Sequence, residues 1–84
     1  MKVSLKLYAS LTEHLPAEAR RGNRVELEVP EGTSILQLIE PYALPPKLVH
    51  LVLVNGVYIQ PEQRTSHVLV DGDVLAIWPP IAGG

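Results

Sequence analysis

The sequence predicts an α+β domain: a sheet of about five strands, one main helix packed on one face of it, and an extended C-terminal tail. Three observations lead to this fold class. Apolar and polar residues alternate in two early segments, a capped helical segment follows them, and two apolar runs bounded by glycine turns close the chain. The 84 residues, 46% apolar and 19% charged, suit one small globular domain.

The first two strands flank a short helical turn. Lys2–Tyr8 and Arg24–Val29 alternate strictly between apolar and polar residues, which is typical of half-buried strands. Between them, Ser10 and Glu13 have the spacing of a capping box, in which each end residue satisfies a backbone N–H of the other. We expect a helical turn to begin at this serine.

The main helix comes next. Thr33 or Ser34 is predicted to cap it, and Ser34 with Gln37 fits the same capping-box spacing. It should end near Glu40, because Pro41 has no N–H and crowds the preceding turn. The predicted inner face carries apolar residues at helical spacing, namely Ile35, Leu38, Ile39 and Tyr42.

The second half of the chain contains two apolar runs. Val49–Val54 and Val74–Trp78 each predict a strand that is apolar on both faces. The Asn-Gly pair at 55–56 predicts a hairpin whose return strand is Val57–Ile59, and Gln60–His67 is predicted as a polar loop. Because one helix cannot cover both faces of a sheet, part of the other face should be apolar and open. Such a face predicts a complex with a partner or a weak homo-oligomer.

Composition excludes several classes of function. A net charge of −2 argues against binding to nucleic acid or to an anionic membrane, which attract basic proteins. The lack of cysteine excludes disulfides, thiolate zinc sites and thiol catalysis. The alternating N-terminus differs from a signal peptide, and no segment approaches the roughly 20 apolar residues of a membrane span. We expect a cytoplasmic protein.

Few residues suggest catalysis. His14, His50 and His67 are isolated, whereas metal ligands cluster. Asp71 and Asp73 flank a glycine ahead of a strand, which indicates a turn rather than an acid–base pair. We find neither a nucleophile elbow nor a glycine-rich phosphate loop. The expectation is no metal, no bound cofactor and no self-contained active site.

The last six residues predict a narrow arm beyond a domain of residues 1–78. They are Pro79, Pro80, Ile81, Ala82, Gly83 and Gly84. The proline pair favours an extended exit, and six residues reach at most about 20 Å. Glycine has no Cβ, so the final two units can pass through a channel that excludes other residues. A carboxylate is unreactive until it is activated, so such an arm implies a separate activating enzyme.

Four motifs carry a family resemblance: Leu7-Tyr8-Ala9-Ser10-Leu11, Val54-Asn55-Gly56, Asp71-Gly72-Asp73-Val74 and the terminal Pro-Pro-Ile-Ala-Gly-Gly. In this order they resemble the sulfur-carrier family of ubiquitin-like proteins, which comprises the molybdopterin synthase small subunit (MoaD) and the thiamine sulfur carrier (ThiS). The resemblance covers essentially the whole chain and implies a β-grasp fold with a mixed sheet.

The family implies chemistry at Gly84. An adenylating enzyme of the ubiquitin-activating type would use Mg-ATP to convert its carboxylate to an acyl-adenylate. A sulfur donor would then displace AMP and leave a thiocarboxylate, which donates sulfur to an acceptor such as the molybdopterin synthase large subunit. On this basis the chain is a non-catalytic sulfur-donating subunit or a co-substrate. The terminal motif favours molybdopterin biosynthesis, whereas the run Leu48–Gly56 is nearer the thiamine-type carriers.

The resemblance also assigns the two faces of the sheet. It places four residues in the core, namely Val52, Val54, Leu75 and Ile77. It leaves Leu51, Leu53 and Trp78 on the open face, where tryptophan is a typical interface anchor. The alternative for Trp78 is that it folds over the edge of its own core. Two alternatives to the sulfur carrier remain: a protein modifier joined to lysines through Gly84, and a plain interaction module with an incidental tail.

Overall fold

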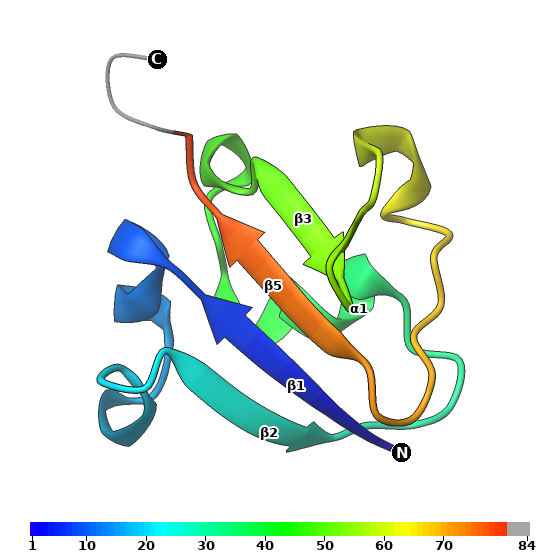
Figure 1. Cartoon of the computed structure of the whole chain (residues 1–84), viewed down its shortest axis with the longest axis horizontal. Helices are drawn as coiled ribbons and strands as arrows, with labels where there is room; N and C mark the ends of the chain where they lie inside the picture. The colour runs from blue at the N-terminus through cyan, green and yellow to red at the C-terminus, as the bar shows by residue number, and fades with distance from the viewer. Residues whose placement is uncertain (81–84) are drawn as a thin grey trace.

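In the part of the chain that the structure describes, a five-stranded mixed sheet forms one layer, and a single short α-helix packs on one of its faces (Figure 1). The computed structural model describes residues 1–80. The strands are β1 (Lys2–Leu7), β2 (Arg24–Glu28), β3 (Leu51–Val54), β4 (Val57–Tyr58) and β5 (Val74–Trp78), in the spatial order β2-β1-β5-β3-β4. This arrangement confirms the predicted fold class.

The first and last strands lie side by side in the middle of the sheet. β1 and β5 pair in parallel, with Leu5 opposite Leu75, while the other neighbouring strands pair antiparallel. Because side chains alternate across a strand, this register sends Leu75 and Ile77 to the helix side, where both are fully buried. Val52 and Val54 are buried there too, as predicted.

The helix α1 (Ile35–Ile39) begins as the sequence predicts. The Ser34 side chain accepts a hydrogen bond from the Gln37 backbone N–H, and the Gln37 side chain accepts one from the Ser34 N–H, which completes the capping box. The helix gives way to a 3-10 turn at Glu40, where Pro41 cannot continue it. The predicted end is therefore confirmed.

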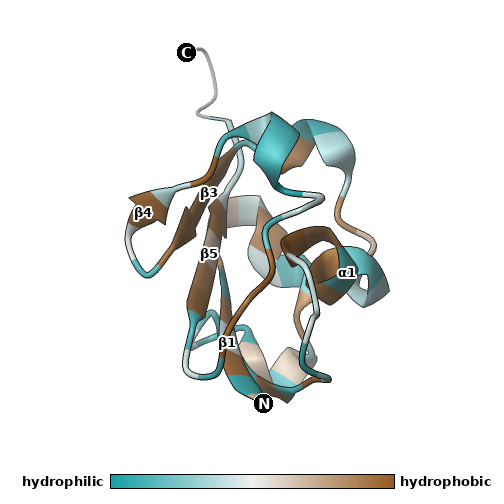
Figure 2. Cartoon of the chain, turned by 90° about the vertical axis from the view of Figure 1, so that its right-hand side faces the viewer, coloured by the Kyte–Doolittle hydropathy of each residue, from teal (hydrophilic) through white to brown (hydrophobic). Residues whose placement is uncertain are grey.

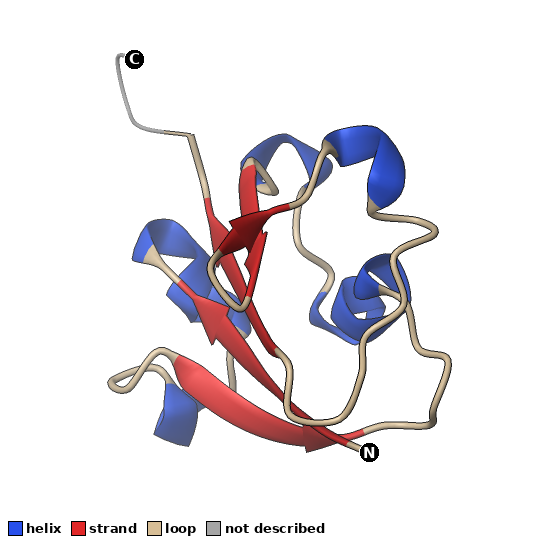
Figure 3. Cartoon of the chain, turned by 45° about the vertical axis from the view of Figure 1, so that its right-hand side comes forward, coloured by secondary structure: helices blue, strands red, loops and turns tan. Residues whose placement is uncertain are grey.

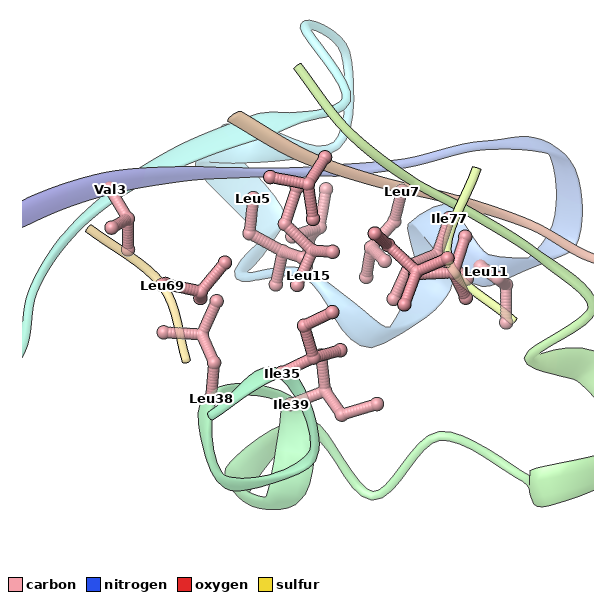
Figure 4. Close-up of a cluster of buried hydrophobic side chains, with 14 residues drawn as sticks. Val3, Leu5, Leu7, Leu11, Leu15, Ile35, Leu38, Ile39, Leu69 and Ile77 are labelled. Carbon is pink, nitrogen blue, oxygen red and sulfur yellow. The ribbon is translucent and has the colours of Figure 1, made fainter. Parts of the chain in front are cut away.

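Short 3-10 helices occupy the connections between strands (Figure 3). They are η1 (Ala9–His14), η2 (Ala17–Ala19), η3 (Glu40–Tyr42), η4 (Pro46–Leu48) and η5 (Pro61–Gln63). The core fills the space between the sheet, α1 and η1 (Figure 4). Leu11 and Leu15 from the η1 region are fully buried in it. Each such leucine stabilises the fold by roughly 1.5–3 kcal/mol.

Two predicted element starts are wrong. Ser10 is exposed and does not cap the first helical turn: η1 begins at Ala9, and its N-cap position is Tyr8, with no side-chain capping bond. The third strand begins at Leu51 rather than Val49, because the η4 turn ends only at Leu48 and its last hydrogen bond closes on Val49. In both places local packing overrides the local pattern.

Candidate partner-binding surface and tail exit

The sheet face that α1 leaves uncovered carries a group of apolar and aromatic side chains. Figure 2 shows β3 and β5 as apolar strands with α1 on one side only. We call this group the open-face cluster; its members are Tyr8, Leu51, Leu53, Tyr58, Ala76 and Trp78. Register pairs them across three strands: Leu51 with Trp78, and Leu53 with both Ala76 and Tyr58. The sheet thus assembles residues that lie far apart in sequence into one surface.

Trp78 is the largest side chain of the cluster. Its ring stacks on Tyr8 with a centroid separation of 4.0 Å and an interplanar angle of 4°. Its neighbour in the sheet, Leu51, is 36% exposed, whereas the preceding residue Ile77 is fully buried on the opposite face. Trp78 therefore lies on the open face and not over the edge of the core. Stacking on Tyr8 fixes the indole in place while keeping it half-exposed, as suits an interface anchor.

Toward β2, the open face of the sheet carries polar and charged residues instead of apolar ones. Ser4 is buried and donates to Glu26, while Arg24 donates to both the Ser4 hydroxyl and the Glu26 carboxylate. These hydrogen bonds, first that from Ser4 and then that from Arg24, lower the pKa of the Glu26 carboxyl below its ordinary value of 4.5. The apolar part of the open face is thus confined to the β3 and β5 side.

The tail leaves the sheet beside this cluster. β5 ends at Trp78, and Pro79 and Pro80 follow outside any strand. Proline has no N–H to extend the ladder, so the chain separates from the sheet here. Because β1 and β5 are parallel, their C-terminal ends lie side by side, so the tail leaves the sheet at the same end as Tyr8. The other predicted tail residues lie outside the described residues: Ile81, Ala82, Gly83 and Gly84.

The aspartates of the 71–73 turn are occupied by structural hydrogen bonds. Asp71 accepts from the Lys2 N–H at 2.7 Å, and Asp73 accepts from the Val70 N–H at 2.9 Å and the Asn55 amide at 2.8 Å. Gly72 sits at φ +88°, a conformation that favours glycine. The turn prediction is confirmed: the carboxylates join β1, β5 and the β3–β4 hairpin.

The histidines do not assemble into a site either. Among residues 1–80, no group of three or more His, Cys, Asp or Glu side chains is placed to hold a metal ion. His14 instead contacts the Tyr42 carbonyl through Nδ1 at 3.2 Å and so links η1 to η3. Within the same residues, the helices are all too short or too polar to cross a bilayer.

Arg64 is the residue that sequence reasoning missed. It lies in the segment predicted as a polar loop, yet it is only 5% exposed and donates to backbone carbonyls on both sides of the β3–β4 hairpin. Arg64 is an isolated arginine in a polar segment, and no periodicity or motif in the sequence around it indicates burial.

Comparison with known proteins gives a consistent picture. The ThiS family model matches residues 14–84. The structure is similar to a putative molybdopterin converting factor subunit 1 from Pyrococcus furiosus, with a TM-score of 0.67, 25% identity and coverage of 96% of this chain and 99% of that one. It also resembles SAMP1 from Haloferax volcanii, with a TM-score of 0.70, 22% identity and full coverage of both chains.

A third similar structure comes from a complex of subunits 1 and 2 of the molybdopterin-converting factor of Helicobacter pylori, with a TM-score of 0.59, 16% identity and full coverage of both chains. No curated protein sequence matches the chain. The likenesses below 25% identity show the shared fold, and the family match covers most of the chain, from β2 through the terminal Gly-Gly. The chain therefore belongs to the ThiS family of ubiquitin-like β-grasp proteins, as the terminal and turn motifs predict.

Proposed function

We propose that this protein is a sulfur carrier whose reactive group is the carboxylate of Gly84, and that it supplies sulfur for molybdopterin biosynthesis. One observation carries the proposal: the family match runs through the terminal Gly83-Gly84. The similarity to the Pyrococcus furiosus converting factor subunit supports the molybdopterin pathway.

The proposed chemistry takes place on a partner enzyme. The Gly84 carboxylate attacks the α-phosphate of Mg-ATP, which releases pyrophosphate and forms an acyl-adenylate. A sulfur donor then displaces AMP, which leaves a thiocarboxylate at the chain end. This chain binds neither nucleotide nor metal in the scheme. Its own contribution is to present Gly84 beyond a stiff proline pair and to bind the partner.

The open-face cluster is the proposed binding surface for both partners, the adenylating enzyme and an acceptor such as the molybdopterin synthase large subunit. Leu51, Leu53 and Trp78 form its centre, beside the point where Pro79 leaves the sheet. A partner bound there lies next to the tail, so binding and presentation of Gly84 are coupled by geometry. The Helicobacter pylori structure is itself a complex of two subunits, which fits a partner-dependent role.

Intact mass spectrometry tests the proposal. The chain is incubated with an adenylating enzyme of the ubiquitin-activating type, Mg-ATP and a sulfide source. The expected product has one oxygen replaced by sulfur. Methionine oxidation adds nearly the same mass, but the one methionine is Met1, at the other end of the chain. Tryptophan can be oxidised in the same way, so fragments that contain Gly84 but not Trp78 assign the change, and an unchanged mass with a competent enzyme contradicts the proposal.

The alternatives use the same tail. An acyl-adenylate at Gly84 is open to attack by a lysine amine as well as by a sulfur donor, so a protein modifier is the second candidate, and a thiamine thiazole carrier is the third. Isolation of Gly84 joined to lysine from cell extracts would support the modifier. The sulfur acceptor distinguishes the two biosynthetic roles. Transfer of sulfur from the thiocarboxylate to a molybdopterin precursor supports the molybdopterin role, and transfer to a thiazole precursor supports the thiamine role.

A further inference from the structure

Arg64 is a buried cation held by backbone carbonyls. It follows η5, and its guanidinium donates from Nε to the Ile59 carbonyl at 3.1 Å, from Nη1 to Val49 at 3.2 Å and from Nη2 to His50 at 3.0 Å. The two ion pairs found among residues 1–80 involve other residues, so the described structure gives this cation no carboxylate partner. The guanidinium also lies 5.9 Å from the centre of the Tyr58 ring.

The geometry explains why a guanidinium is needed at this position. On the β4 side of β3, the carbonyl of Val52 accepts from the Ile59 N–H at 2.9 Å. The His50 carbonyl comes two residues earlier, just before β3 begins, at a residue whose N–H faces β5. β4 is only two residues long and does not reach it. The rigid fork of Arg64 supplies the missing donors, which a lysine ammonium cannot match in number or geometry.

The same His50 residue also contacts the tail exit. Its N–H donates to the carbonyl of Trp78 at 3.2 Å, and Trp78 is the last residue of β5 before the proline pair. Arg64, His50 and Trp78 thus form a continuous series of hydrogen-bonded groups that ends at the tail.

We infer that Arg64 is a positioning residue for the tail: by holding the His50 peptide it fixes the Trp78 junction and so the direction in which Pro79 leaves the sheet. This inference rests on the proposed function, since it assigns Arg64 a role in presenting Gly84. When the junction loosens, only part of the population holds Trp78, the anchor of the open-face cluster, and the tail exit in the arrangement that the partner binds. Apparent affinity for the partner falls in proportion to that fraction, while the bound complex reacts at the same rate.

The kinetic test compares Arg64→Met, Arg64→Lys and the core control Ile39→Val. Ile39 is the last residue of α1 and is 6% exposed, so its variant loses core packing without removing a hydrogen bond to His50 or Trp78. Thiocarboxylate formation is measured at a temperature where all four proteins are folded by circular dichroism. We expect KM for the chain to rise about tenfold in Arg64→Met with kcat little changed, to rise less in Arg64→Lys, and to stay at the wild-type value in Ile39→Val.

A second readout needs no enzyme. The chain has one tryptophan, so its indole N–H gives a single nuclear magnetic resonance signal that reports on the junction. We expect this signal to shift and the His50 N–H to exchange faster in Arg64→Met but not in Ile39→Val. Unchanged exchange and an unchanged indole signal overturn the positioning role, as does a KM equal to that of the control. If wild type forms no thiocarboxylate, the proposed function fails, and the resonance data still decide the structural claim.

Discussion

At the scale of single residues, Trp78 contributes most to the proposed binding surface. It combines a large apolar ring, partial exposure and a fixed orientation against Tyr8, which are the properties of residues that dominate interfaces. We expect Trp78→Ala to weaken binding to the adenylating enzyme by about 2 kcal/mol, or roughly thirtyfold, as measured by isothermal titration calorimetry.

The matched control for that change is Val70→Ala, whose apolar side chain is 61% exposed but lies outside the open-face cluster. It should leave the dissociation constant unchanged. If Trp78→Ala binds like wild type and only lowers the melting temperature, the indole serves the fold and the open face is not the binding surface.

Glu26 predicts a pH dependence of stability. The hydrogen bonds from Ser4 and Arg24 lower its pKa below 4.5 in the folded protein, so the folded state keeps the carboxylate charged at lower pH than the unfolded chain does. The stabilisation is present above pH 4.5 and is lost as pH falls through the lowered pKa. The melting temperature of Glu26→Gln should lie below that of wild type at pH 7, and the gap should close in acid. A gap that persists at low pH would show that charge is not its cause.

At the scale of elements, the capping box of α1 has a natural control within the chain. Ser34 is 6% exposed and caps a helix that places three apolar residues in the core, so Ser34→Ala should cost about 1 kcal/mol of unfolding free energy. Ser10 and Glu13 have the same spacing in the sequence as Ser34 and Gln37, but Ser10 forms no cap. Ser10→Ala should therefore change stability by less than about 0.5 kcal/mol. Urea denaturation measures both, and equal losses would contradict the assignment.

These two serines also show what a local pattern can predict. Capping-box spacing states which hydrogen bonds a serine is able to make, and the structure uses them only where the following residues bury a helical face. After Ser34 that condition is met by Ile35, Leu38 and Ile39. Near Ser10 the chain turns at Ala9, with φ +53°, and buries Leu11 through a 3-10 turn instead. Strand and helix types were therefore predictable from periodicity, whereas their first residues depend on tertiary packing.

The candidate surface was predictable for a similar reason, and Arg64 was not. Apolar residues at both alternating positions of β3 and β5 are visible in the sequence, and strand geometry then sends Leu51, Leu53 and Trp78 to one face. The need for Arg64 arises only in the folded sheet, where β4 is too short to pair with the His50 carbonyl. Such a requirement has no signature in the spacing of residues along the chain.

At the scale of the whole molecule, binding and chemistry are assigned to separate parts: the open-face cluster binds, and Gly84 reacts. One residue added after Gly84 should therefore abolish thiocarboxylate formation while the calorimetric dissociation constant stays close to wild type, because the cluster and the Pro79 exit are unchanged. Trp78→Ala should do the reverse: binding weakens, and at saturating chain concentration the product still forms. If the extended chain still gains sulfur, the reacting group is not the Gly84 carboxylate. If it instead loses binding altogether, the tail supplies most of the affinity and the sheet face little.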